Sequence, residues 1–287
     1  MYSKILVPLD GSRTSEPILL YARLFADAYG IPVELLRVND PDARPPFWPS
    51  ESSGRYLKKI ADEYFSGRAS TSAEAGAPAA FIVDHAKTDP SCLIAMATHG
   101  LSGARRWLLG SVTSKVVQTA TNPLLLIRPS HNFDASKPVR MDQIFVPLDG
   151  SALAEKALPH ACALAKRLNP EIQLLRVYSL PMDAYVVADG VIARGPAQYR
   201  EELAKQAHDY LEGKVAALRA DGFERVVGIA LEGDAASEII DLASKTPDSL
   251  IAMSTHGRSG IGRWVLGSVA EKILQHAHNP LLLIRAN

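Results

Sequence analysis

One long pattern occurs twice in this chain of 287 residues, and the duplication limits the possible folds more than any other feature. The repeated segments are ILVPLDGS (Ile5–Ser12) and IFVPLDGS (Ile144–Ser151), MATHGLSGARRWLLGSV (Met96–Val112) and MSTHGRSGIGRWVLGSV (Met253–Val269), and NPLLLIR (Asn122–Arg128 and Asn279–Arg285). Domains commonly have about 100 to 200 residues, so two copies predict two domains of one fold. We place these domains at residues 1–130 and 141–287, joined by a polar linker at residues 131–140.

Strand and helix patterns alternate within each copy. ILVPL, VELLRV, CLIAMA and PLLLI are short, nearly continuous apolar runs, which are typical of parallel strands covered on both faces. Between them we predict helices at Glu16–Tyr29, Tyr56–Tyr64 and Ala79–Ala86, and a fourth helix whose apolar face begins at Val112. This alternation predicts an α/β fold with a doubly wound parallel sheet and right-handed crossovers.

The second copy is longer than the first. The spacing grows from 139 residues between Ile5 and Ile144 to 157 between Asn122 and Asn279, which is a gain of 18 residues. The gain falls between the second and third strands, around residues 181–196 and a helical stretch at Gln198–Ala220. We expect an elaborated loop and a longer helix there, with no assigned function.

Charge and cysteine content exclude several classes of function. Lysine plus arginine and aspartate plus glutamate number 31 each, so no net field draws the chain to nucleic acid or to an anionic membrane. Two cysteines, Cys92 and Cys162, form neither a disulfide framework nor a metal-ligand cluster. We see no basic and apolar leader before KILVPLD and no apolar run near the roughly 18 residues of a membrane span. We therefore expect a cytoplasmic protein that binds neither nucleic acid nor membrane.

In each half the glycine-rich segment follows a buried strand and opens a helix. Glycines let the backbone approach a ligand, and the first N–H groups of a helix attract anions. Ser111 and Ser268 add a hydroxyl at the helix start. The spacing fits neither the GxGxxG dinucleotide fingerprint nor the P-loop, because the P-loop lysine is missing. The segment favours a phosphate site, and a purely structural strand-to-helix connection is the alternative.

PLDGS ends the first strand of each half. Asp10 and Asp149 could close an Asx turn or cap the next helix, which is the commoner role of a lone DGS. In an open doubly wound sheet, however, ligands bind beyond the carboxyl ends of the strands where the strand order reverses. An aspartate at that point can accept hydrogen bonds from an adenine or a ribose.

These motifs together resemble the universal stress proteins, over both halves and nearly the whole chain. As a tandem, the sequence is similar to the two-domain members. The family's nucleotide-binding pattern is glycine, two residues, glycine, nine residues, glycine, and then serine or threonine. The matching residues are Gly100, Gly110 and Ser111 in the first half and Gly257, Gly267 and Ser268 in the second half. Ala97 and Ser254 replace the first glycine, and each adds a Cβ where the pattern has none.

The resemblance implies two five-stranded parallel sheets of order 3-2-1-4-5, with the last strands of the two domains paired across a pseudo-twofold axis. The chain would thus be an intrachain pseudo-dimer, and a further homodimer stays open. It also implies ATP or another adenine nucleotide in up to two sites. Asp10 and Asp149 would contact the nucleoside, Val38 and Val177 would pack near the adenine, and loop amides would hold the phosphates.

The candidate nucleotide-binding residues follow from these motifs. They are Pro8, Asp10, Val38, Ala97, His99, Gly100, Gly110, Ser111 and Val112 in the first half, and Pro147, Asp149, Val177, Ser254, His256, Gly257, Gly267, Ser268 and Val269 in the second half. His99 and His256 could be phosphate ligands or acid–base groups, and a structural hydrogen-bonding role is the alternative. Arg106 and Arg263 could approach phosphate oxygens, or could simply be solvated.

No residue is assigned as catalytic or as a metal ligand. Phosphoryl transfer usually uses lysine, arginine and Mg²⁺ ligands, and the loop shows none of them in a recognisable arrangement. The sequence thus favours a stress-response protein that binds ATP, with or without Mg²⁺, and acts through its conformation or an unknown protein partner. A slow ATP hydrolase or ATP-dependent transferase and a nucleotide-free interaction protein are the alternatives.

Overall fold

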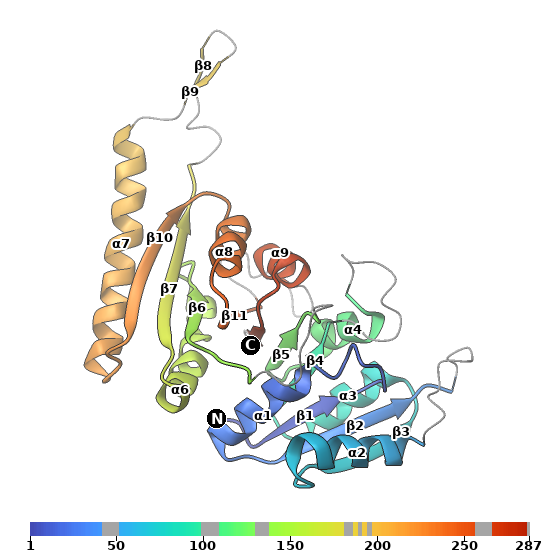
Figure 1. The fold of residues 1–287 in the computed structure, drawn as a ribbon. Helices are drawn as coiled ribbons and strands as arrows, with labels where there is room; N and C mark the ends of the chain where they lie inside the picture. The colour runs from blue at the N-terminus through green and yellow to red at the C-terminus, as the bar shows by residue number, and fades with distance from the viewer. Residues whose placement is uncertain are drawn as a thin grey trace.

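The computed structural model describes residues 1–41, 52–98, 109–129, 138–180, 186–188, 191–193, 197–255 and 266–285. In this part of the chain, ten strands form one sheet in the order β10-β7-β6-β11-β12-β5-β4-β1-β2-β3 (Figure 1). Each half contributes five neighbouring strands in the order 3-2-1-4-5, and all pairings within a half are parallel. The structure is therefore the α/β, doubly wound fold that the alternating pattern predicts.

The first half alternates strands and helices as expected. Its strands are β1 (Lys4–Pro8), β2 (Val33–Asn39), β3 (Ser70–Ala75), β4 (Cys92–Ala97) and β5 (Leu124–Ile127). Its helices are α1 (Ile18–Tyr29), α2 (Ser53–Phe65), α3 (Pro78–Lys87) and α4 (Ser111–Thr119). The four predicted helices are confirmed, with ends that shift by a few residues.

The second half repeats this plan with two additions. Its sheet strands are β6 (Gln143–Pro147), β7 (Glu171–Tyr178), β10 (Val226–Glu232), β11 (Ser249–Ser254) and β12 (Leu281–Ile284). Its helices are α5 (Ala152–Glu155), α6 (Leu158–Leu168), α7 (Ala197–Ala220), α8 (Ala235–Ser244) and α9 (Ser268–His276). The additions are the length of α7 and an antiparallel hairpin of β8 (Val186–Ala188) and β9 (Val191–Ala193), which lies beyond the N-terminal end of α7 in Figure 1.

Helix α7 packs along the edge strand β10. A Cβ at Gly228 in β10 would lie 2.9 Å from the Cβ of Leu211 in α7, so glycine permits this close approach. The 24 residues of α7 are mixed in polarity, and among the described residues no helix is both long and apolar enough to cross a membrane.

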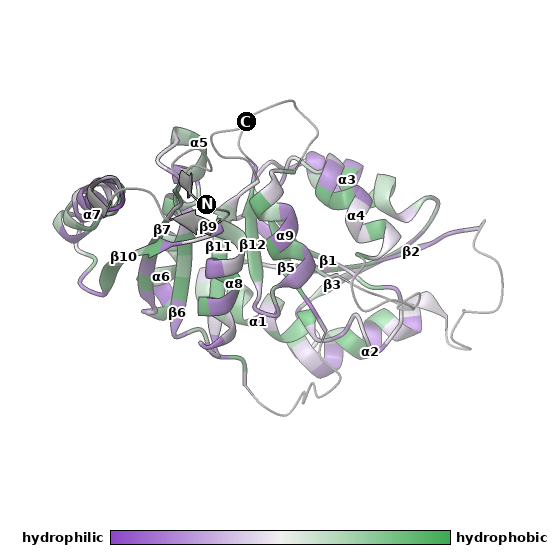
Figure 2. Ribbon diagram, turned by 90° about the horizontal axis from the view of Figure 1, so that it is seen from above, coloured by the Kyte–Doolittle hydropathy of each residue, from purple (hydrophilic) through white to green (hydrophobic). Residues whose placement is uncertain are grey.

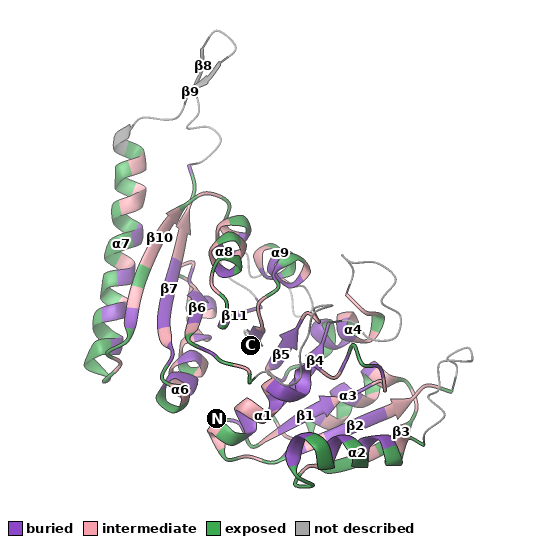
Figure 3. Cartoon of the chain, viewed as in Figure 1, coloured by how far each residue is buried: buried purple, intermediate pink, exposed green. Residues whose placement is uncertain are grey.

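The sheet separates two apolar layers. One layer lies against α1, α2, α6 and α7, with Phe25 and Leu164 among its fully buried residues. The other lies against α3, α4, α8 and α9, with Ile94 and Ile273 among its members. Figure 2 shows the hydrophobic strands between helices of mixed hydropathy, and Figure 3 shows that the inner strands are buried while much of α7 is exposed. Burial on both faces explains why the strands read as continuous apolar runs.

The two halves join through one antiparallel strand pair at the centre of the sheet. Strand β12 pairs with β5 so that Leu282 faces Leu125, while Leu281 faces Leu126 and Leu283 faces Leu124. Since Leu125 and Leu282 are equivalent residues of the repeat, a pseudo-twofold axis passes between them. All residues of both strands are buried. Among the described strands, the pairing leaves β3 and β10 as the edges of the ten-stranded sheet.

Two equivalent arginines, Arg128 and Arg285, each extend from one half to a helix end of the other half. Arg285 donates from Nε to the Ala120 carbonyl at 2.7 Å and from Nη2 to the Val117 carbonyl at 2.5 Å, at the end of α4. Arg128 donates from Nη2 to the Leu274 carbonyl at 3.2 Å, and also to the Gln275 carbonyl, in the last turn of α9. The last carbonyls of a helix lack partners within the helix and carry partial negative charge, so each half supplies a cation to a helix end of the other half.

A second contact between the halves lies on the face that α1 and α6 cover. The Tyr2 hydroxyl and His160 Nδ1 are 2.7 Å apart, and the Arg167 guanidinium lies 4.6 Å from the ring centre of Tyr29. Burial, together with the charge of the N-terminal amine, lowers the pKa of His160 to about 4. The contact is therefore built around a neutral imidazole at neutral pH.

We expect Arg285→Ala to lower the free energy of unfolding by about 1–3 kcal/mol, because it leaves helix-end carbonyls without donors at a part-buried site. Urea denaturation measures this change. Arg140→Ala removes an arginine whose side chain is 68% exposed and should change the value by less than about 0.5 kcal/mol. Equal effects of the two variants would contradict the role that we assign to Arg285.

The low pKa of His160 predicts a pH dependence of stability. The pKa is about 4 in the folded protein against an ordinary value of 6.5, so the unfolded chain takes up this proton first. Stability from this group is present above pH 6.5 and is lost as the pH falls towards 4. We expect His160→Asn to have a shallower decline over this window in chemical denaturation at a series of pH values. Parallel profiles of variant and wild type would contradict this assignment.

Candidate functional site

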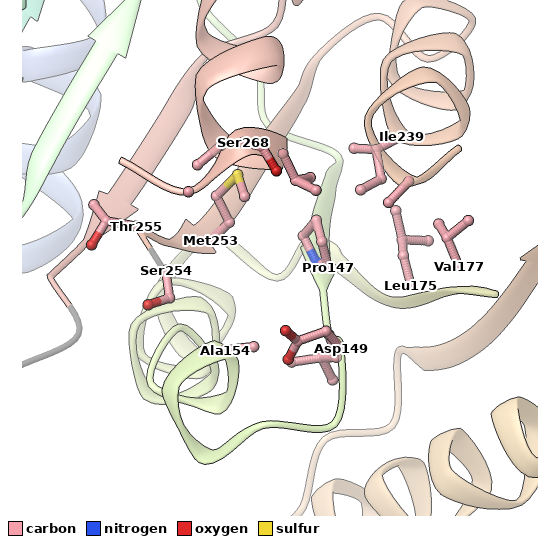
Figure 4. Close-up of a pocket in the computed structure, with 15 residues that line it drawn as sticks. Pro147, Asp149, Ala154, Leu175, Val177, Ile239, Met253, Ser254, Thr255 and Ser268 are labelled. Atoms are coloured by element: carbon pink, nitrogen blue, oxygen red, sulfur yellow. The ribbon is translucent and has the colours of Figure 1, made fainter. Parts of the chain in front are cut away.

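A cavity of about 230 Å³ opens at the carboxyl ends of β6 and β11 in the second half (Figure 4). It is lined by Pro147, Leu148, Asp149, Ala154, Leu175, Val177, Ala235, Ile239, Met253, Ser254, Thr255, Gly267, Ser268, Val269 and Ala270. Strands β6 and β11 are neighbours, and the chain continues from them to opposite sides of the sheet. The cavity therefore lies where the strand order reverses, which is where open α/β sheets bind ligands.

Seven of the nine residues predicted for this half line the cavity; His256 and Gly257 lie outside the described residues. Pro147 ends β6, Val177 is near the end of β7 and Ser254 ends β11. Gly267 caps α9, and Ser268 is the first residue of that helix. Strand ends and one helix start thus bring together residues that are more than 100 positions apart in the sequence.

The equivalent residues of the first half occupy matching places. Pro8 ends β1 and Val38 lies in β2, while Ala97 ends β4 beside β1. Gly110 caps α4 and Ser111 begins it, followed by Val112. His99, Gly100 and Arg106, like Arg263 in the second half, lie outside the described residues.

The aspartate of each PLDGS segment closes an Asx turn. Asp149 Oδ1 accepts from the Ser151 amide at 2.9 Å and from the Ser151 hydroxyl at 2.6 Å. Asp10 Oδ1 accepts from the amide and hydroxyl of Ser12 at 2.9 and 2.7 Å. The structural role that a lone DGS predicts is thus present in both halves. Since Asp149 also lines the cavity, the turn fixes the orientation of a carboxylate at the site.

A partly buried arginine, Arg176, packs against the same turn in the second half. Gly150 has φ +83°, and a Cβ there would lie 2.6 Å from Arg176 Nη1. The Arg176 guanidinium carbon is 5.0 Å from the ring centre of Tyr210, whose hydroxyl donates to Glu155 Oε1 at 2.8 Å. Lys214 Nζ is 2.7 Å from the other oxygen of Glu155. The turn that Asp149 closes therefore packs against a connected group of charged side chains and the Tyr210 ring.

These charges shift the pKa values of the group. Burial raises the pKa of Tyr210, and the hydrogen bond to Glu155 with the negative charges of Glu155 and Asp149 raises it further, against the effect of Arg176. The hydroxyl stays protonated and remains a donor. Burial also raises the pKa of Glu155, but hydrogen bonds from Lys214 and Tyr210 outweigh burial and leave the pKa below its ordinary value.

The first half carries an equivalent group of side chains, but its carboxylate, Glu16, is less stabilised than Glu155. A Cβ at Gly11, φ +85°, would lie 3.0 Å from the Arg37 guanidinium, which is 5.4 Å from the ring centre of Tyr56. The Tyr56 hydroxyl donates to Glu16 at 3.3 Å. Burial raises the pKa of Glu16, and the Tyr56 hydrogen bond with the charges of Arg13 and Lys59 does not offset this effect. The contacts of Glu155 in the second half, at 2.8 and 2.7 Å, are therefore shorter than the contact of Glu16 in the first half.

Sequence reasoning missed these groups, although part of the signal was present. Glu16 and Glu155, and likewise Arg37 and Arg176, are identical at the 139-residue spacing of PLDGS. Tyr56 and Tyr210 fall outside that spacing, because the extra residues of the second half come between strand and helix.

Helices α4 and α9 begin at the site without a side-chain cap. Gly110 and Gly267 are the capping residues, and as glycines they provide no side-chain hydrogen bond to the first turn. By contrast, Asp234 caps α8 through the Ser237 amide. Uncapped first-turn amides with a partial positive charge can hold an anion. No group of three or more histidine, cysteine or acidic side chains is placed to hold a metal ion within the described ranges.

We expect Gly150→Ala to lower the free energy of unfolding by about 1–3 kcal/mol, because alanine is strained at φ +83° and its Cβ meets Arg176. Thermal or urea unfolding measures the loss. Gly213→Ala in α7 is the matched control: the added Cβ meets nothing, and helix propensity predicts a gain of about 0.5–1 kcal/mol. A Gly150→Ala variant as stable as wild type would show that the turn does not depend on this glycine.

Comparisons with known proteins agree with this architecture. Universal stress protein MJ0531 of Methanocaldococcus jannaschii is 32% identical over 143 residues, which cover 50% of this chain and 81% of the relative. A universal stress protein of Mycolicibacterium smegmatis is 23% identical over 303 residues, covering 98% of this chain and 96% of the relative. The crystal structure of a universal stress protein from Archaeoglobus fulgidus superposes with a TM-score of 0.67 and 20% identity, covering 99% of this chain and 98% of the other.

A sequence model of the universal stress protein family matches residues 1–128 and again residues 141–285. The two matches coincide with the two copies of the repeated pattern and with the two halves of the ten-stranded sheet. The chain belongs to the universal stress protein family, with one family unit in each half.

Proposed function

We propose that this protein binds ATP or another adenine nucleotide in up to two sites, one per half, and acts through its nucleotide-dependent conformation or a protein partner. The observation that carries the proposal is the cavity at the ends of β6 and β11, where Asp149 and the start of α9 lie on one opening. The binding residues are those predicted from the sequence, which resemble the family's nucleotide-binding pattern.

The walls of the cavity suit the parts of a nucleotide. Leu175, Val177, Ile239 and Met253 form an apolar surface of the kind that takes a flat purine base. The Asp149 carboxylate accepts hydrogen bonds from an amine or a ribose hydroxyl. The uncapped start of α9 supplies amides for phosphate.

Anion binding here has to come from local groups. The chain has 31 basic and 31 acidic residues, so long-range attraction to phosphate is weak. The start of α9, with the amides of Ser268 and Val269, supplies a fixed positive end beside the cavity. A cytoplasmic location belongs to the same proposal: Cys92 and Cys162 are both free thiols, as a reducing compartment favours.

Titration of the wild type with a fluorescent ATP analogue tests the proposal, with saturable binding of up to two molecules per chain as the expected result. Asp149→Asn keeps a side-chain oxygen for the Asx turn but removes the charge. We expect it to weaken binding at the second site about 10- to 100-fold, which corresponds to the loss of one charge-assisted hydrogen bond. Asp10→Asn should do the same at the first site.

Asp241→Asn is the control, because Asp241 pairs with Lys245 on the exposed face of α8. It should leave the affinity unchanged. Absence of saturable binding in the wild type would overturn the proposed function.

A further inference from the structure

The two halves are not identical around their sites. Of the 15 residues that line the cavity of the second half, 11 are the same at the equivalent positions of the first half. The four exceptions, first half to second half, are Ser15 to Ala154, Pro78 to Ala235, Ala97 to Ser254 and Thr113 to Ala270. Three of these four changes add or remove a hydroxyl.

In the first half, the hydroxyls of Ser15 and Thr113 have hydrogen-bond partners within the protein. Ser15 is 5% exposed, and its Oγ donates to the Ser12 carbonyl at 2.9 Å. Thr113 is 4% exposed, and its Oγ1 donates to the Ala97 carbonyl at 3.1 Å. Each of these hydroxyls thus donates its one hydrogen within the protein and has none left to donate to a ligand.

Ser254 in the second half is different. It is 4% exposed, and its Oγ has no hydrogen-bond partner among the described residues. Strand alternation places it on the same face as Ala252, and Figure 4 shows its side chain on the Asp149 and Ala154 side of β11. A buried hydroxyl without a partner costs free energy, since water satisfies it in the unfolded chain. Ser254 is one of the residues that line the cavity, so a ligand bound there can supply the missing partner.

Asp149 limits which ligand group this can be. A carboxylate accepts hydrogen bonds, so the ligand group that faces it is a donor such as a ribose hydroxyl. Ser254, which lines the same cavity, offers the complementary O–H donor to a ligand oxygen. A ribose oxygen or a phosphate oxygen provides this shared chemistry.

We propose that Ser254 is a specificity-determining residue: its hydroxyl donates to an oxygen of the bound nucleotide, so the second site binds the nucleotide more tightly than the first, where Ala97 has only a methyl group. The inference rests on the proposed function. It makes the tandem a protein with one stronger and one weaker site.

The test isolates each site by calorimetry with ATP. In an Asp10→Asn background, which weakens the first site, Ser254→Ala should weaken binding about 5- to 10-fold, the worth of one neutral hydrogen bond. The residual affinity should approach that of the first site measured in the Asp149→Asn background. The first half has alanine at the equivalent position 97, so the fold accepts this side chain.

Unfolding without nucleotide separates a ligand contact from a structural role. Because the Ser254 hydroxyl has no partner in the described part of the protein, Ser254→Ala should leave the melting temperature unchanged or raise it while the affinity falls. A lower melting temperature with unchanged affinity would show a structural hydroxyl and overturn the inference.

Titration with adenosine identifies the oxygen. If Ser254→Ala weakens adenosine and ATP by the same factor, the acceptor is a ribose oxygen; if it weakens ATP alone, the acceptor is a phosphate oxygen. Equal affinity of wild type and variant for both compounds would overturn the role of Ser254 and leave the proposed function standing. Absence of any saturable ATP binding by the wild type would overturn both.

Discussion

The antiparallel pairing of β5 with β12 is the contact on which the rest of the structure depends. Each five-stranded sheet alone would expose a fully apolar edge strand, LLLI, which would pair with any similar edge. Pairing the two edges satisfies their backbone groups and continues both apolar layers across the junction. Arg128 and Arg285 then tie a helix end of each half to the strand end of the other.

The PLDGS turns show how one side chain can serve fold and site together. Asp149 uses Oδ1 to close the turn over Ser151, and the turn directs the carboxylate to the cavity. Below it, the Arg176 guanidinium packs against Gly150 and Tyr210. A rigid loop loses less conformational freedom when a ligand binds, so this packing favours a preorganised site.

The sequence predicts much of the fold, because buried parallel strands and helix faces leave strong periodic signals. LLLI and CLIAMA are read directly as strands, and the structure has them at β5, β12 and β4. Strand β3, STSAEA, has no apolar run, since an edge strand with mostly exposed residues needs none. The β8–β9 hairpin was likewise read only as an elaborated loop.

The site was predictable to a similar degree. Strand ends and helix starts follow from the elements, so the positions of Asp149 and Ser268 could be expected. The cluster of Arg176 with Tyr210 could not, because it depends on how α7 packs on β7. The unpartnered state of the Ser254 hydroxyl also needed three-dimensional information, since it depends on which atoms surround the end of β11.

The pseudo-twofold axis has one more consequence. In a dimer of identical subunits, any substitution appears on both sides of the axis, so an interface or a pair of sites can change only symmetrically. Here the two sides are covalently joined and encoded separately. The association of the two halves therefore does not depend on protein concentration, as it would in a dimer of separate chains. A residue can therefore change on one side alone, as Thr113 and Ala270 illustrate, and the two linked halves can diverge without loss of the shared sheet.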